Sequence, residues 1–203
     1  MRKLGLILFV TLLITGCATH KTGQSDGLLS ALQQGGYVIF FRHAATDHTQ
    51  KDTDLNDPTN CAAQRHLDER GREQSRIIGE GFKINKIPVG DVVTSQFCRC
   101  SNTAKIAFGK AQTSIDITSI QGVTPEERQR RIAGIREMLN TPPRPGTNTV
   151  LVAHKWMFKD ASGVLLEEGE AAIFKPQSEG MALLVRRVLP EQWKTLAQIA
   201  ETP

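Results

Sequence analysis

Residues 37–46 read YVIFFRHAAT and join a strongly apolar run to an arginine–histidine pair. Tyr37 to Phe41 is an uninterrupted run of aromatic and β-branched residues, which is typical of a strand buried on both faces of a sheet. The run leads directly into Arg42 and His43. The expected strand therefore presents two polar side chains at its carboxyl end.

Similar apolar segments recur along the chain and alternate with helical patterns. Further strands are expected at 91–95, 149–153, 171–174 and 181–188, the last two paired as a hairpin. Helices are expected at 28–34, 68–83, 98–109, 124–140 and after Pro190. This alternation predicts an α/β fold, a three-layer sandwich with a mostly parallel central sheet and helices on both faces. Residues 27–203 are expected to form this one domain.

In sheets of this kind, ligands bind beyond the carboxyl ends of the strands. The expected strand ends point to Arg42 with His43, to residues 95–99 and to His154. Residues 44–66 between the first strand and the next helix are polar and rich in Asp, Thr and Asn, so they are expected to form a long loop. Loops of this length in small domains are often functional.

The residues at these strand ends resemble motifs of the histidine phosphatase superfamily. Residues 42–46 fit its first motif, Arg-His-Gly/Ala-x-Thr, and residues 67–74 resemble its L-x-x-x-G-x-x-Q segment. Residues 95–104 resemble its S-x-x-x-R-x-x-x-T-A segment, and residues 152–154 its second, strand-ending histidine. The four segments occur in the family's order, and the resemblance covers residues 36–190.

The chemistry of phosphoryl transfer suits these residue types. A phosphoryl group needs a cationic pocket, and arginine side chains match its oxygens in a bidentate way. A neutral imidazole can attack phosphorus and form a covalent phosphohistidine. The resemblance implies that His43 is the nucleophile and that Arg42, Arg99 and His154 hold the phosphoryl oxygens. Thr46 is expected to add a hydroxyl contact to the substrate.

The residue that protonates the leaving group is less well determined by the sequence. Branches of the family place this acid differently, and one branch has an aspartate directly after the second histidine, where this chain has Lys155. We expect Glu170 to be the general acid, with Glu168 and Asp160 as alternatives. Lys155 is expected to place a cation near an acidic substrate.

Composition sets limits on the class of protein. The 203 residues are 39% hydrophobic and 23% charged, which is typical of a globular chain. A net charge of +4 and 5% aromatic residues do not favour a nucleic-acid partner. The chain has no Gly-rich phosphate loop or dinucleotide fingerprint. The start of a calcium loop at residues 52–56 lacks the required glycine and final glutamate, so no metal and no cofactor are expected.

The first residues are typical of an export signal. Two basic residues precede the apolar stretch 4–15, which is shorter than a membrane-spanning helix needs. It ends in Ile-Thr-Gly-Cys, which resembles a bacterial lipobox, so residues 1–16 are expected to be a lipoprotein signal peptide and Cys17 to be lipidated. Residues 17–26 would then be the lipidated cysteine and a tether, and Ala18 favours the outer membrane, facing the periplasm. The alternative is an ordinary signal peptide.

Export permits disulfides among the remaining cysteines. Cys98 and Cys100 are two residues apart and point the wrong way to bridge each other. Cys61 can pair with either. We favour Cys61–Cys98, because Cys98 adjoins Arg99 and this bridge would hold the polar loop over the site.

These observations lead to two main hypotheses. The first is a lipid-anchored phosphomonoesterase that acts through a phosphohistidine on an envelope or periplasmic phosphate ester, either a small molecule or a glycolipid. The second is a non-catalytic envelope lipoprotein that binds a phosphorylated ligand. A purely structural lipoprotein is a weaker third hypothesis.

Overall fold

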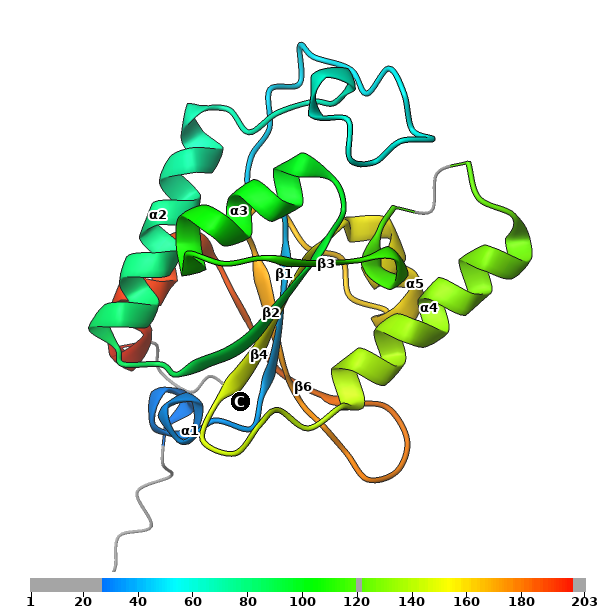
Figure 1. The fold of residues 1–203 in the computed structure, drawn as a ribbon. Helices are drawn as coiled ribbons and strands as arrows, with labels where there is room; N and C mark the ends of the chain where they lie inside the picture. Colours follow the sequence, from blue (N-terminus) through cyan, green and yellow to red (C-terminus); the bar gives the residue numbers. More distant parts are fainter. Residues whose placement is uncertain (1–26, 120–121, 199–203) are drawn as a thin grey trace, which may run out of the picture.

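A six-stranded sheet in the order β3-β2-β4-β1-β5-β6 runs through the middle of the molecule (Figure 1). The structure is a computed structural model that describes residues 27–119 and 122–198. The strands are β1 (Val38–Arg42), β2 (Val89–Ser95), β3 (Gln112–Ser114), β4 (Asn148–Ala153), β5 (Ala171–Lys175) and β6 (Leu183–Val188). The expected signal peptide, Cys17 and the tether lie outside the described residues.

The strand pairing is mostly parallel. β1 and β2 both run parallel to β4, and β3 runs parallel to β2. β5 is antiparallel to β1, and β6 is antiparallel to β5. Parallel register places Arg42 opposite Ala153, so the ends of β1 and β4 lie side by side. The predicted α/β fold with a mostly parallel sheet is confirmed.

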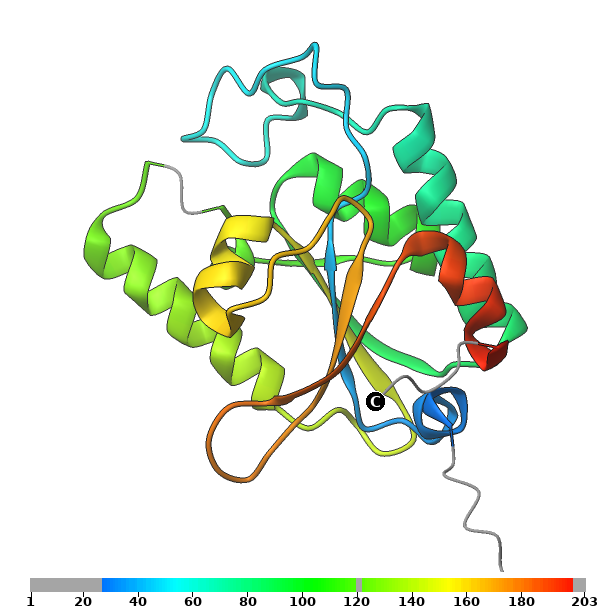
Figure 2. The same ribbon diagram turned by 180° about the vertical axis from the view of Figure 1, so that it is seen from behind.

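Helices cover both faces of the sheet (Figures 1 and 2). One face carries α1 (Leu28–Gln34), α2 (Glu69–Ile84), α3 (Cys98–Phe108) and the 3-10 segment η3 (Pro190–Gln198). The other carries α4 (Pro125–Asn140) and α5 (Lys155–Ser162). Two further 3-10 turns are η1 (Cys61–Ala63) and η2 (Ile115–Ile117). None of the helices in the described ranges is long and apolar enough to cross a membrane.

β1 separates two apolar cores. Side chains along a strand point alternately to opposite faces. Ile39 and Phe41 therefore pack into the core under α2, α3 and η3. Phe40 packs into the core under α4 and α5, where its ring stacks on Phe158 with centroids 3.8 Å apart. Burial on both sides explains why the sequence of this strand is an unbroken apolar run.

Two elements differ from the sequence-based expectation. α5 occupies residues 155–162, where the sequence analysis expected no helix. This helix begins without a side-chain cap, so no start signal marks it, and it is stabilised by burying Met157 and Phe158. The segment after Pro190 is a kinked 3-10 segment rather than an α-helix.

Candidate active site

The carboxyl ends of β1, β2 and β4 meet at one edge of the sheet, and loop 47–66 lies beyond that edge (Figure 1). A pocket of about 280 Å³ opens there. Its lining consists of Arg42, His43, His48, Asp52, Arg65, Arg99, Ser119, His154, Lys155 and Trp156. The structure therefore brings together five of the residues that the sequence singled out: Arg42, His43, Arg99, His154 and Lys155.

His43 follows β1 and is almost fully buried. Its Nδ1 lies 2.9 Å from the carbonyl oxygen of Ala44. A carbonyl can only accept, so Nδ1 carries the proton and Nε2 of a neutral ring keeps its lone pair. Burial, followed by the positive charge of Arg99, holds the pKa of His43 well below its usual value. At neutral pH the imidazole is therefore uncharged and its Nε2 is nucleophilic.

His154 ends β4 and stands at the N-terminus of α5. Its Nε2 shares a hydrogen bond of 2.8 Å with Oγ of Ser95, the last residue of β2. The two histidine rings are 5.6 Å apart in an edge-to-face arrangement. Burial, followed by the positive charges around it, also holds the pKa of His154 well below its usual value.

Arg42 and Arg99 supply fixed positive charge. Arg42 donates from Nη1 to the carbonyl oxygen of Leu166, and its Nη2 lies 3.3 Å from the Glu168 carboxylate. Arg99 donates from Nη1 to Asp52 at 3.0 Å, and its guanidinium lies over the ring of Phe97. The Nε atoms of both arginines are buried without a hydrogen-bond partner among the described residues.

Gly71 and Gln74 on α2 explain the family's L-x-x-x-G-x-x-Q spacing in physical terms. A Cβ at Gly71 would lie 1.9 Å from the carbonyl oxygen of Ala45, so only glycine lets α2 pack against this backbone. Gln74 accepts a hydrogen bond from the N–H of Ala45 at 2.8 Å and donates to the carbonyl oxygen of Glu168. α2 thus fixes the backbone that follows His43.

Thr103 explains the spacing of the S-x-x-x-R-x-x-x-T-A segment. Its hydroxyl accepts a hydrogen bond from the N–H of Ala44 at 3.1 Å and donates to the carbonyl oxygen of Arg99 at 2.7 Å. One side chain therefore ties the backbone beside His43 to the first turn of α3, which carries Arg99.

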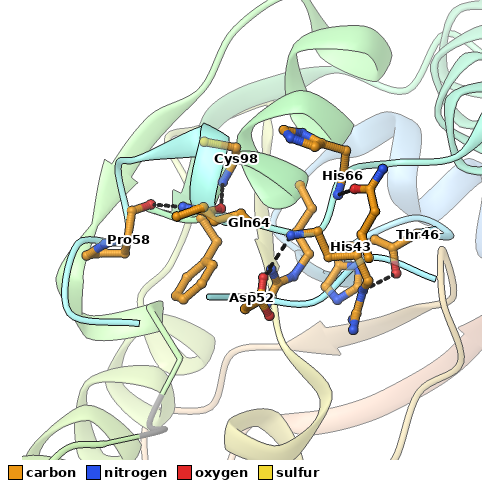
Figure 3. A network of polar contacts seen from close by, with 12 residues as sticks. His43, Thr46, Asp52, Pro58, Gln64, His66 and Cys98 are labelled. Atoms are coloured by element: carbon orange, nitrogen blue, oxygen red, sulfur yellow. Dashed lines mark hydrogen bonds and ion pairs between the residues drawn. The ribbon is translucent and has the colours of Figure 1, made fainter. Parts of the chain in front are cut away.

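Arg65 and Asp52 are pocket residues that the sequence analysis did not single out. Both come from loop 47–66, and the backbone N–H of Arg65 donates at 2.9 Å to Asp52, which is labelled in Figure 3. The only signal in the sequence was the polar character of the loop as a whole. Nothing in the spacing indicated which of its many charged residues would face the pocket.

The structure contradicts the assignment of Glu170 as general acid. Both of its carboxylate oxygens accept hydrogen bonds from Arg187, at 2.8 and 2.9 Å, and one also accepts from the N–H of Glu167. Both carboxylate oxygens are therefore held by these partners, and Glu170 does not line the pocket. Of the alternatives, Asp160 pairs with Arg128 away from the pocket.

Two further carboxylates lie nearer the site. Glu168 contacts Arg42 and Thr46 beside the site, but it does not line the pocket. Asp52 is the carboxylate that lines the pocket among the described residues. Residues 27–119 and 122–198 contain no group of three or more His, Cys, Asp or Glu side chains that could hold a metal ion.

Thr46 is also placed differently from the expectation. Its side chain is 1% exposed and does not line the pocket. The hydroxyl donates to Glu168 at 3.0 Å and accepts from Nε of Arg65 at 2.8 Å. Because both hydrogen bonds are made to protein groups, Thr46 supports Arg65 instead of contacting a substrate directly.

Cys61 and Cys98 form a disulfide that joins η1 in the loop to the first residue of α3. Cys100 is the free cysteine of the described residues and lies buried, with its sulfur 3.6 Å from Nε2 of His154. Burial raises the pKa of Cys100 to about 12, so it stays a protonated thiol at neutral pH.

The comparisons with known proteins agree with this site. The family model of the histidine phosphatase superfamily (branch 1) matches residues 38–120, which include His43, Arg65 and Arg99. Over these residues the chain is similar to this superfamily. A comparison with curated proteins found no match.

Solved structures with a similar fold include several phosphatases. The protein histidine phosphatase SixA, complexed with tungstate, is 15% identical, with a TM-score of 0.53 over 76% of this chain and 97% of that one. A phosphoserine phosphatase from Entamoeba histolytica is 13% identical, with a TM-score of 0.53 over 74% and 95%. A mycobacterial glucosyl-3-phosphoglycerate phosphatase is 15% identical, with a TM-score of 0.50 over 69% and 92%. Family and fold together support a phosphatase enzyme.

Proposed function

We propose that this protein is an exported, lipid-anchored phosphomonoesterase that acts through a phosphohistidine intermediate. The proposal rests on the protonation of the His43 ring. Its Nδ1–H is held by the carbonyl oxygen of Ala44, so the lone pair of Nε2 is available in a pocket lined by three arginines. A neutral nucleophile among fixed cations suits attack on a negatively charged phosphoryl group.

In the first step, Nε2 of His43 attacks phosphorus, a new N–P bond forms, and the P–O bond to the leaving group breaks. Arg42 and Arg99 stabilise the charge on the non-bridging oxygens, because phosphoryl transfer depends mainly on positioning and electrostatics. Their buried, unpartnered Nε atoms are donors that phosphoryl oxygens would satisfy. His154 contacts the same oxygens from the end of β4.

In the second step, water attacks the phosphohistidine, the N–P bond breaks and inorganic phosphate leaves. Asp52 is the carboxylate placed in the pocket to exchange protons in both steps. It protonates the leaving oxygen in the first step and accepts a proton from water in the second. Lys155 and Trp156 line the mouth and contact the remainder of the substrate.

The proposed substrate is a phosphate ester of the bacterial envelope or periplasm. Support comes from the export signal and the lipobox that ends in Cys17. The arrangement of the fold is compatible with such an anchor. α1 lies at the end of the molecule opposite loop 47–66, so a tether that precedes it would leave the pocket accessible (Figure 1).

The test is hydrolysis of para-nitrophenyl phosphate by the purified full-length protein with EDTA present. We expect turnover that persists in EDTA and is lost, by a factor of about 1,000 or more, in His43→Ala. After a rapid quench, the phosphoryl group on the protein should be labile in acid and stable in base, as a phosphoramidate is and a phosphoester is not. Binding of phosphate without turnover of any activated ester would instead support the non-catalytic lipoprotein.

A further inference from the structure

Loop 47–66 is connected to the pocket through a defined set of contacts (Figure 3). The Cys61–Cys98 disulfide fixes the loop to α3 at the residue next to Arg99. Gln64 strengthens this attachment, since its Oε1 accepts from the N–H of Cys98 at 2.9 Å and its Nε2 donates to the carbonyl oxygen of Pro58 at 2.8 Å. The loop is therefore attached to α3 by a covalent bond and a buried amide.

Arg65 is the residue directly after Gln64, and its position is fixed at two points. Its N–H donates to Asp52, which in turn accepts from Arg99. Its side-chain Nε donates to the buried hydroxyl of Thr46. Both contacts leave the terminal Nη1 and Nη2 groups of Arg65 without a protein partner among the described residues, and Arg65 lines the pocket.

The charge of Arg65 acts on the same residues as the other two arginines. After burial and the charges of Arg99 and Arg42, the guanidinium of Arg65 also lowers the pKa of both His43 and His154. A cation with two unpaired, coplanar N–H groups beside the nucleophile matches the geometry of phosphoryl oxygens.

We propose that Arg65 is a third phosphoryl-binding arginine, and that the Cys61–Cys98 disulfide keeps it in the pocket. The inference rests on the proposed function, because it assigns an additional contact to the same phosphoryl site. Reduction by a dithiol converts the disulfide to two thiols and oxidises the dithiol to its cyclic disulfide. The loop then keeps non-covalent contacts to α3, such as the hydrogen bonds of Gln64 and Asp52, and Arg65 is held less firmly beside His43.

The first part of the test separates binding from turnover. Affinity for tungstate, a tetrahedral oxyanion like phosphate, is measured by calorimetry for the full-length protein, Arg65→Ala and Arg65→Lys. Loss of charge-assisted hydrogen bonds predicts about 10- to 100-fold weaker binding for Arg65→Ala and a smaller loss for Arg65→Lys. The matched control is Arg144→Ala, which removes the same charge at an exposed site paired with Asp91, away from the pocket. It should bind tungstate as the unaltered protein does.

The second part tests the disulfide. The Cys61→Ser/Cys98→Ser variant should bind tungstate about tenfold or more weakly, while circular dichroism shows the folded state. In hydrolysis of para-nitrophenyl phosphate, dithiothreitol should lower kcat/KM of the unaltered protein by a similar factor and leave the double variant unchanged. If the double variant does not fold, the reductant experiment on the folded protein tests the same point.

Two results would overturn the inference: tungstate affinity that is unchanged in Arg65→Ala, or activity and affinity that are indifferent to the disulfide. A failure of the proposed function would be seen in hydrolysis and not in tungstate binding. A protein that binds tungstate but hydrolyses no ester would refute the phosphatase assignment, while the binding series would still decide the role of Arg65.

Discussion

The tautomer of His43 is fixed by its own neighbour in the sequence. The carbonyl oxygen of Ala44 holds the proton on Nδ1, and Thr103 holds the N–H of the same residue. Both contacts are made within the protein, one to the next residue and one to α3, so the proposed nucleophile is oriented before any substrate binds. Such preorganisation contributes to the rate because no protein rearrangement is needed at the moment of reaction.

Burial of the two histidines makes stability depend on pH. Folding lowers the pKa of His43 and His154 below the usual value of 6.5, mainly through burial. Below about pH 6.5 the unfolded chain therefore binds protons that the folded chain does not. The free energy of unfolding should fall between pH 7.5 and 5, by up to about 1.4 kcal/mol per pH unit for each group.

Urea unfolding in phosphate-free buffer at pH 7.5 and 5 measures this effect. His43→Asn removes one of the two groups, so the variant should lose less stability on acidification than the unaltered protein. An equal loss in both proteins would show that other groups cause the acid sensitivity.

The role of Asp52 as proton donor can be tested by comparing Asp52→Asn on two esters whose leaving groups differ in their need for a proton. Asparagine keeps an oxygen that can accept from the N–H of Arg65, but it cannot donate a carboxyl proton. Hydrolysis of an alkyl phosphate, which needs protonation of its leaving oxygen, should fall by about 100-fold or more. Hydrolysis of para-nitrophenyl phosphate should fall much less, because nitrophenolate leaves without a proton.

The control for Asp52→Asn is Asp54→Asn, which alters a nearby loop carboxylate outside the pocket lining. Comparison of kcat/KM for the two esters decides the role of Asp52. Equal losses on both substrates would mean that Asp52 positions the arginines and does not transfer the proton.

At the scale of elements, α2 supports the site through close contact with the backbone after β1. A Cβ at Gly71 would overlap the carbonyl oxygen of Ala45, and this backbone cannot yield without displacing His43. Gly71→Ala should therefore lower the free energy of unfolding by about 1–3 kcal/mol, the usual cost of overpacking, and reduce kcat. Thermal unfolding and para-nitrophenyl phosphate hydrolysis measure the two effects.

Glu73→Ala lies on the exposed side of the same helix and provides the comparison for Gly71→Ala. It should change stability by no more than about 0.5 kcal/mol, as surface substitutions usually do. A Gly71→Ala protein with unchanged activity would show that α2 can shift away without moving His43.

The elements also show which parts of the molecule could be predicted. β1 and β4 were found from their apolar runs, because burial on both faces leaves a continuous pattern in the sequence. β3 was missed because its three residues, Gln-Thr-Ser, are polar and pair only through their backbone. α5 was missed because its start carries no capping residue.

The same distinction applies to the site. Arg42, His43, Arg99 and His154 lie at or just after strand ends, so their meeting follows from the topology of a parallel sheet. Arg65 and Asp52 depend on how a long loop folds back, which the disulfide and Gln64 decide through tertiary contacts. Glu170 was wrong because its partner, Arg187, comes from a strand 17 residues further along the chain, and no local pattern indicated that pairing.

At the scale of the whole molecule, the two ends of the sheet have different neighbours. Loop 47–66 and the pocket lie at the carboxyl ends of the parallel strands, whereas α1 lies at the opposite end, where the described chain begins (Figures 1 and 2). Residues 17–26 would span at most about 35 Å if fully extended. A lipid on Cys17 would therefore hold the domain close to a membrane without covering the pocket.

This arrangement predicts that anchoring and catalysis are separable. Cys17→Ala should move the protein from the membrane pellet to the soluble fraction of the envelope, because Cys17 is the proposed site of the lipid. Its kcat/KM on soluble para-nitrophenyl phosphate should stay within about twofold of the unaltered protein, since the described lining of the pocket does not include Cys17. Cell fractionation and the assay on each fraction measure both effects.

An unaltered protein found in the soluble fraction would contradict the lipid anchor. A soluble Cys17→Ala protein with impaired turnover would mean that the N-terminal segment contributes to the site.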